Sequence, residues 1–169
     1  MKRYQFLRRG FTLIELLIVI ALLGALAVGL IGALDPFEQL KKGTDTGTRD
    51  IVNQIQTAVI RYYSVKNDMP WIADPASTNL ATAPMAAAIT AMASAGELKT
   101  DFTTIQSTNL TKVFVTGSTL NSTVAVCYKP TAKSFQNDPN TKFKIDGTLE
   151  VANTCKSAGG AQDCYWCIQ

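Results

Sequence analysis

An uninterrupted apolar segment dominates the first part of the chain. It covers residues 11–34, and Thr12 and Glu15 are its only polar members. As a helix it would be about 36 Å long, which is enough to cross a hydrocarbon core of roughly 30 Å. Basic residues precede it, and basic residues beside a span favour the cytoplasmic side. The pattern predicts one membrane-spanning helix, with everything after Leu34 outside the cytoplasm.

A second helix is predicted over residues 35–66. Apolar residues recur there at three- and four-residue spacing with polar residues between them, which is typical of a helix that lays one face on a core. Pro36 removes one helical hydrogen bond, so it favours a kink or a break at the start of this segment. The apolar positions are Phe37, Leu40, Ile51, Val52, Ile55, Ala58, Val59 and Tyr62.

The second half of the chain changes from helical to strand-like patterns. A loop at residues 75–79 precedes an alanine-rich helix, which begins near Pro84 and ends at Gly96. After Phe102, β-type residues predict strands. These are expected over residues 112–116 and 122–128, with an antiparallel return over 131–135 and weaker candidates at 148–151 and 165–168. A helix followed by antiparallel strands predicts an α+β domain, in which one sheet rests on one helix.

Composition and charge narrow the range of functions. The chain has 169 residues, 47% of them hydrophobic, which excludes a disordered or collagen-like protein. It contains no histidine, which excludes Ser-His-Asp and Cys-His catalysis. The net charge is +3, but the first ten residues hold four of the 16 basic residues and none of the 13 acidic ones. The rest is slightly acidic, which argues against nucleic-acid binding, and no catalytic residues are predicted.

The most specific motif lies at the start of the apolar segment. Residues 8–15, RRGFTLIE, resemble the prepilin signature of type IV pilins and type II secretion pseudopilins. In that family a membrane aspartyl peptidase cuts after the glycine and methylates the new N-terminus. The resemblance therefore implies cleavage between Gly10 and Phe11, N-methylation of Phe11, and an apolar helix that stays in the mature protein. It also implies the pilin fold, a long N-terminal helix packed on a small antiparallel sheet.

Glu15 distinguishes this interpretation from two simpler ones. A carboxylate in a membrane costs about 2.5–3.5 kcal/mol near the bilayer centre and less near its edge. A secretory signal peptide, which residues 25–27 and the arginine pair also suggest, leaves Glu15 unexplained, as does a plain membrane anchor. Cleavage would create a positive amine at Phe11. We expect this amine and Glu15 of a neighbouring subunit to neutralise each other and to set the axial stagger of the helices.

Four cysteines lie in the part predicted to be outside the cytoplasm, namely Cys127, Cys155, Cys164 and Cys167. Their even number and oxidising location favour two disulfides in one of three pairings. Among these we favour a bond from Cys127 to one C-terminal cysteine, which would fasten the tail to the sheet. The CxxC spacing of Cys164 and Cys167 suggests zinc binding or redox activity as alternatives to a structural disulfide. A second CxxC pair is missing, however, and the chain ends where a redox motif would need a helix.

Cofactors are not predicted, with calcium as the one open case. Some major pseudopilins bind calcium in a C-terminal loop. Here residues 137–140, Asp146 and Asp163 place carboxylates and amides in loops. Their spacing matches no EF-hand, and Asp and Asn are also common turn residues.

Together these features predict four segments. They are a cleaved leader at residues 1–10, a transmembrane or filament-core helix at 11–34, its amphipathic half at 35–66, and an extracellular α+β domain at 67–169. The resemblance implies a non-enzymatic subunit that forms a helical homo-oligomeric filament through its apolar helix. Its implied partners are a prepilin peptidase, an inner-membrane assembly platform and the membrane, with no nucleic acid.

The expected location changes during assembly. The precursor would be a single-pass membrane protein, and the mature subunit would join an extracellular pilus or a periplasm-spanning pseudopilus. A major pseudopilin of a type II secretion system is the main alternative, and a secreted or anchored non-pilin protein is the other. A DNA-uptake pilin is disfavoured by the charge of the outer domain.

Overall fold

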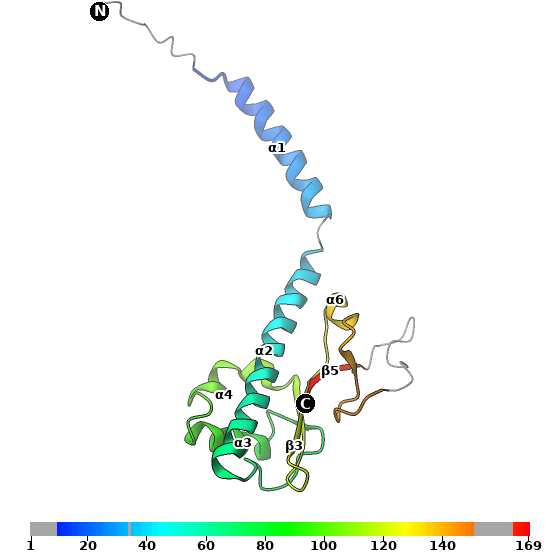
Figure 1. Ribbon diagram of the computed structural model, residues 1–169. Coiled ribbons are helices and arrows are strands. Elements are labelled where there is room, and N and C mark those ends of the chain that lie inside the picture. The colour runs from blue at the N-terminus through cyan, green and yellow to red at the C-terminus, as the bar shows by residue number, and fades with distance from the viewer. Residues whose placement is uncertain (1–9, 34, 151–163) are drawn as a thin grey trace, which may run out of the picture. The chain divides into compact units, whose positions relative to one another are not determined.

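The computed structural model describes residues 10–33, 35–150 and 164–169 (Figure 1). The chain divides into two compact units, and the boundary lies between Phe37 and Glu38. The first unit contains helix α1, Leu13–Ala33, and the side chains of residues 13–32 are exposed. By length and composition, Leu13–Gly32 can cross a membrane. The predicted long apolar helix is thus confirmed.

Helix α2, Pro36–Lys66, is the central helix of the second unit. Asp35 caps it, because its carboxylate accepts a hydrogen bond from the backbone N–H of Phe37 at 3.2 Å. From Asp45 onward one face of α2 is buried. Its buried residues are Asp45, Thr48, Ile51, Val52, Ile55, Gln56, Ala58 and Val59. The predicted amphipathic helix therefore packs one side on a core.

Five antiparallel strands form one sheet in the order β1-β2-β3-β5-β4. They are β1 Thr78–Asn79, β2 Val113–Ser118, β3 Thr123–Tyr128, β4 Thr141–Phe143 and β5 Tyr165–Ile168. β2 and β3 form a hairpin in which Val115 lies opposite Val126. Both valines are buried in one hydrophobic cluster with Ile51 and Ile55 of α2. The α+β prediction of one sheet on one helix is confirmed.

Short helices complete the core beside α2. Helix α3, Ala83–Ser94, is the predicted alanine-rich helix, and it ends where Gly96 adopts a φ of +81°. Two helices that were not predicted follow it, α4 Phe102–Ile105 and α5 Ser107–Leu110. Each buries one large side chain, Phe102 or Leu110. Figure 1 shows α3 and α4 together beside α2.

The strand predicted at residues 131–135 is wrong. Helix α6, Lys133–Gln136, forms there instead. The carboxylate of Asp45 accepts hydrogen bonds from the backbone N–H groups of Thr131 and Ala132, and this holds the chain in a turn as α6 begins. A contact with a distant residue thus overrides the local β-type pattern.

Three further segments differ from the prediction. Strand β4, Thr141–Phe143, was not predicted and pairs with β5. Residues 78–79, predicted as part of a loop, pair with β2 as strand β1. The candidate strand at residues 148–151 is reduced, where the structure describes it, to one bridge between Leu149 and Phe143. The other expected strands form as β2, β3 and β5.

Candidate functional site

Glu15 lies in the first turn of α1 and caps that turn. Its Oε2 accepts hydrogen bonds from the backbone N–H of Thr12 at 2.9 Å and from the Thr12 hydroxyl at 2.8 Å. In return, the Glu15 backbone N–H donates to Thr12 Oγ1 at 3.3 Å. This reciprocal arrangement is a capping box. Thr12 was not predicted as part of the site, although threonine followed three residues later by glutamate is the signature of that motif.

The capping box occupies only part of the Glu15 carboxylate. Both Thr12 donors bind Oε2, and no donor within the described ranges reaches Oε1. Gly10, Phe11 and Glu15 are all exposed. Oε1 is therefore open to a cation from another molecule, which would form a charge-assisted hydrogen bond.

Asp45 links α2 to the segment that leads into α6. It is 2% exposed. Oδ2 accepts from the backbone N–H groups of Thr131 at 2.8 Å and Ala132 at 2.7 Å, and Oδ1 accepts from the Thr131 hydroxyl at 2.9 Å. Burying a carboxylate is costly unless its oxygens are hydrogen-bonded, and these three bonds meet that need. They join parts of the chain that are more than 80 residues apart.

Arg49, one turn further along α2, strengthens this link. Its guanidinium lies 4.5 Å from the ring centroids of both Phe135 and Trp166, and it donates to Asp138 Oδ2 at 3.1 Å. Cation–π contacts of this kind attach the segment around α6 and strand β5 to the helix. Burial raises the pKa of the Tyr128 hydroxyl above its usual value, and the nearby guanidinium of Arg49 opposes this rise.

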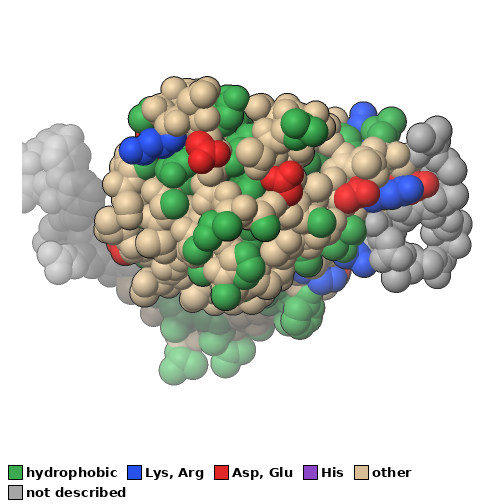
Figure 2. Space-filling model, turned by 90° about the horizontal axis from the view of Figure 1, so that it is seen from below, with side chains coloured by type: hydrophobic (Ala, Val, Ile, Leu, Met, Phe, Trp, Pro, Cys, Tyr) green, Lys and Arg blue, Asp and Glu red, His purple; other side chains and the backbone are tan. Residues whose placement is uncertain are grey.

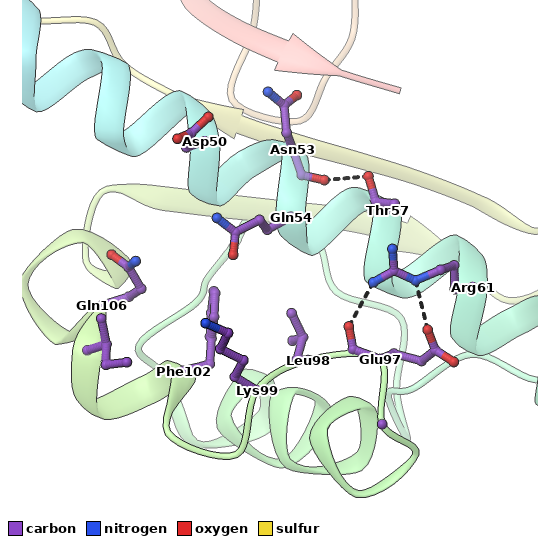
Figure 3. A pocket seen from close by; sticks show the side chains of 12 residues that line it. Asp50, Asn53, Gln54, Thr57, Arg61, Glu97, Leu98, Lys99, Phe102 and Gln106 are labelled. Atoms are coloured by element: carbon purple, nitrogen blue, oxygen red, sulfur yellow. Dashed lines mark hydrogen bonds and ion pairs between the residues drawn. The ribbon is translucent and has the colours of Figure 1, made fainter.

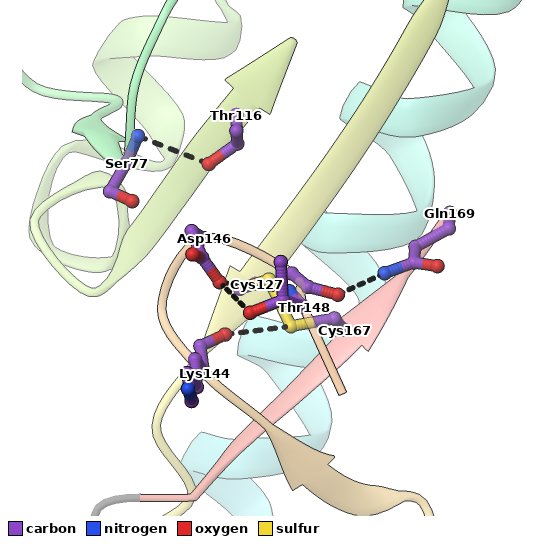
Figure 4. Close-up of a disulfide and its surroundings, with 9 residues drawn as sticks. Ser77, Thr116, Cys127, Lys144, Asp146, Thr148, Cys167 and Gln169 are labelled. Carbon is purple, nitrogen blue, oxygen red and sulfur yellow. Dashed lines mark hydrogen bonds between the residues drawn. A yellow bond between two sulfur atoms is a disulfide. The ribbon is translucent and has the colours of Figure 1, made fainter. Parts of the chain in front are cut away.

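A disulfide joins Cys127 of β3 to Cys167 of β5 (Figure 4). The two residues lie opposite each other in the strand register, so the bond fastens the last strand to the sheet. A bond between Cys127 and a C-terminal cysteine is the kind that the sequence favours. Cys164 is also disulfide-bonded. Cys155 lies outside the described residues, so the second pairing stays a prediction.

The turn at residues 144–148 lies against the disulfide (Figure 4). Gly147 has a φ of +81°, and a Cβ there would lie 2.5 Å from the Ala125 Cβ, so both conformation and space require glycine. Asp146 Oδ1 accepts from the hydroxyl and the backbone N–H of Thr148, at 2.6 and 2.8 Å. These bonds hold the pKa of Asp146 below its usual value. Asp146 therefore acts as a turn-forming residue.

A groove of about 610 Å³ lies between α2 and residues 96–106 (Figure 3). Polar side chains of α2 line one wall, and Leu98 and Phe102 contribute to the other. Arg61 bridges the walls, because it donates to the carboxylate and to the carbonyl of Glu97, each at 2.8 Å. None of the site residues predicted from the sequence lines this groove.

A protein-family model matches the start of the chain. Residues 6–31 match the prokaryotic N-terminal methylation motif, and this range includes Gly10, Phe11 and the capped Glu15. The chain carries a prepilin-type methylation motif. Comparisons with curated proteins and with solved structures found no match. The family evidence therefore comes from this motif, and the fold from the structure.

The methylation motif is the hallmark of type IV pilins and pseudopilins. It indicates a pilin-like or pseudopilin precursor that a prepilin peptidase processes and that assembles into a filament. The apolar helix at Leu13–Gly32 fits a membrane-anchored precursor, and the helices with their five-stranded sheet are consistent with the pilin fold. The motif favours a structural role over an enzymatic one.

The loop carboxylates considered for calcium have other contacts. Asp138 binds Arg49, and Asp146 binds Thr148. Asp163 lies outside the described residues. Within the described ranges, no cluster of three or more Cys, Asp or Glu side chains could hold a metal ion.

Proposed function

We propose that the chain is a structural subunit of a type IV pilus-like surface filament. The observation that carries this proposal is the open Oε1 of Glu15 within the methylation motif. Cleavage between Gly10 and Phe11 creates a free amine at Phe11, which is methylated in a second step. In the filament this amine binds Glu15 of a neighbouring subunit, because each charge is costly alone in an apolar environment. The four-residue separation corresponds to a stagger of about 6 Å.

Close packing of α1 supplies the rest of the assembly energy. Lipid tails are as apolar as leucine, so transfer of the helix from lipid into a filament core gains little hydrophobic energy. Three glycines of this segment leave room for a neighbouring helix, since nothing lies within 4 Å of a Cβ built on any of them. They are Gly24, Gly29 and Gly32.

The proposed life cycle assigns a role to each segment. Residues 1–10 are the leader, residues 11–34 span the membrane and then enter the filament core, and residues 35–66 support the outer domain at 67–169. The precursor waits in the membrane with this domain outside the cytoplasm. After processing, an inner-membrane assembly platform moves the subunit into the filament.

Mass spectrometry of the mature N-terminus tests the processing step. We expect the mature chain to begin with an N-methylated Phe11. A start near Val28 or Phe37 would instead identify a cleaved secretory signal and contradict the proposal.

Substitutions at the capping box test the assembly step. Glu15→Gln keeps an acceptor for Thr12 but removes the charge, so we expect normal membrane insertion and at least a tenfold loss of filaments. Thr12→Ala is the matched control, because it weakens the cap and keeps the charge, and we expect it to assemble normally. Normal filament numbers with Glu15→Gln would show that capping alone explains this carboxylate.

Imaging separates a pilus from a pseudopilus. Wild-type cells should carry surface filaments that disappear when the gene is deleted. A secretion defect in cells that never show surface filaments would favour a pseudopilin of a type II secretion system.

A further inference from the structure

One carboxylate ties two loops together near the C-terminal end of α2. Asp74 Oδ1 accepts from the backbone N–H of Thr119 at 2.9 Å, from the Thr119 hydroxyl at 2.5 Å and from Trp71 Nε1 at 3.2 Å. The Trp71 ring also lies so close to Gly117 that a Cβ there would overlap the ring. The loop at residues 71–75 and the β2–β3 turn therefore form one surface. The Thr119 bonds hold the pKa of Asp74 below its usual value.

This surface exposes large apolar side chains. Ile72 is 102% exposed and Leu120 is 91% exposed, and each is one residue from a group that binds Asp74. An apolar groove of about 380 Å³ lies beside Ile72, lined by Trp71 and Met85 among others. We call Ile72, Leu120 and this groove the distal patch. Figure 2 views this end of the domain, where hydrophobic side chains reach the surface.

A second apolar surface lies at the other end of α2. Phe37, Leu40, Thr44 and Thr48 follow helical spacing along one face. Thr48 is buried, whereas Phe37 is 73% exposed and Leu40 is 69% exposed. We call the uncovered positions, Phe37, Leu40 and Thr44, the α2 stripe. It continues the face of α2 that packs on the sheet, so it is an amphipathic face without a cover in the single subunit.

Charges beside the two surfaces are of opposite sign. Asp68 and Asp74 are exposed near the distal patch, where Lys66 is the nearest base in the sequence. Beside the α2 stripe lie three bases, Lys41, Lys42 and Lys133, and two acids, Asp35 and Glu38, so the bases exceed the acids by one; Glu38 contacts both Lys41 and the backbone of Lys133. Acidic groups around one patch and basic groups around the other favour mutual recognition.

The two surfaces also lie far apart on one subunit. Leu40 and Lys66 are separated by about 39 Å along α2. Two different complementary surfaces on one chain make a heterologous contact, which repeats into an open-ended polymer.

We propose that the distal patch of one copy docks on the α2 stripe of a second copy, an inference that rests on the proposed filament function. This contact gives the outer domains an axial link that is separate from the Glu15 pair.

Cysteine crosslinking in assembled filaments tests this contact. The full-length double variant Leu40→Cys, Ile72→Cys should form a ladder of covalent multimers under mild oxidation. The matched control Leu40→Cys, Ile105→Cys should not, because Ile105 is 61% exposed but lines the separate groove between α2 and residues 96–106. Intact filaments without a ladder, or an equal ladder in the control, would overturn the docking.

A charge at the distal patch gives a second test. Ile72→Asp should reduce filament number about tenfold, since it removes an apolar side chain that docking would bury and adds an acid, and Ile105→Asp should leave the number unchanged. Equal filament numbers in both variants would overturn the docking and leave the proposed function standing. If the wild-type chain forms no filament, the proposed function fails, and the docking fails with it.

Discussion

Replacing Asp45 by alanine would test whether one buried carboxylate holds the C-terminal part of the sheet domain to α2. Ala132 is 0% exposed, so its N–H would lose its partner without access to water, at a cost of about 1–3 kcal/mol. Thr131 is exposed and can bind water instead, so its two bonds should cost about 0.5–1 kcal/mol each. We expect the free energy of unfolding to fall by about 2–5 kcal/mol.

Urea denaturation of the full-length chain in detergent micelles would measure this loss. Tryptophan fluorescence is a suitable probe, because one of the two tryptophans, Trp166, contacts Arg49 one turn away from Asp45. Asp50→Ala is a matched control on the same helix, since Asp50 is exposed, and its effect should stay within about 0.5 kcal/mol. If the free energy of unfolding of Asp45→Ala is also within about 0.5 kcal/mol of the wild-type value, the carboxylate does not hold the C-terminal part of the sheet domain to α2.

Three other perturbations have defined outcomes. Replacing Cys127 and Cys167 by serine opens a 40-residue loop and should lower the free energy of unfolding by about 4 kcal/mol in non-reducing urea titrations; an unchanged midpoint would contradict this. Gly117→Ala should cost about 1–3 kcal/mol because its Cβ would overlap a tryptophan ring, and a neutral result would show that the ring can shift. The link between Asp74 and Thr119 should be intact above the usual pKa of aspartate and lost as the pH falls below the lowered pKa of Asp74, which the hydrogen-exchange protection of the Thr119 amide can follow; protection that does not change with pH would refute it.

Elements set by local pattern could be predicted from the sequence. The apolar run and Pro36 locate α1 and the start of α2, and Gly96 marks the end of α3. Elements set by distant contacts could not. The β-type residues at 131–135 form α6 because Asp45 binds that segment, and β1 is too short to show a strand pattern of its own.

The residues of the candidate sites also fall into those that local pattern predicts and those that depend on distant contacts. Gly10, Phe11 and Glu15 could be found because their order along the chain forms the motif, and Thr12 could have been found by its spacing from Glu15. The partner of Cys127 depends on which strands are neighbours, and the spacing of the cysteines carries no information on strand order. Only the register between β3 and β5 brings Cys127 opposite Cys167.

The bond between β3 and β5 has a mechanical consequence for a subunit under tension. When the chain is pulled from its two ends, the 40-residue loop closed by Cys127 and Cys167 cannot extend, because the force passes through the disulfide bond instead. The disulfide therefore reduces the maximum length of the unfolded, stretched domain by roughly 130–140 Å. An unfolded subunit with the disulfide intact therefore extends less under a given force, and reduction of the disulfide increases the extension at the same force.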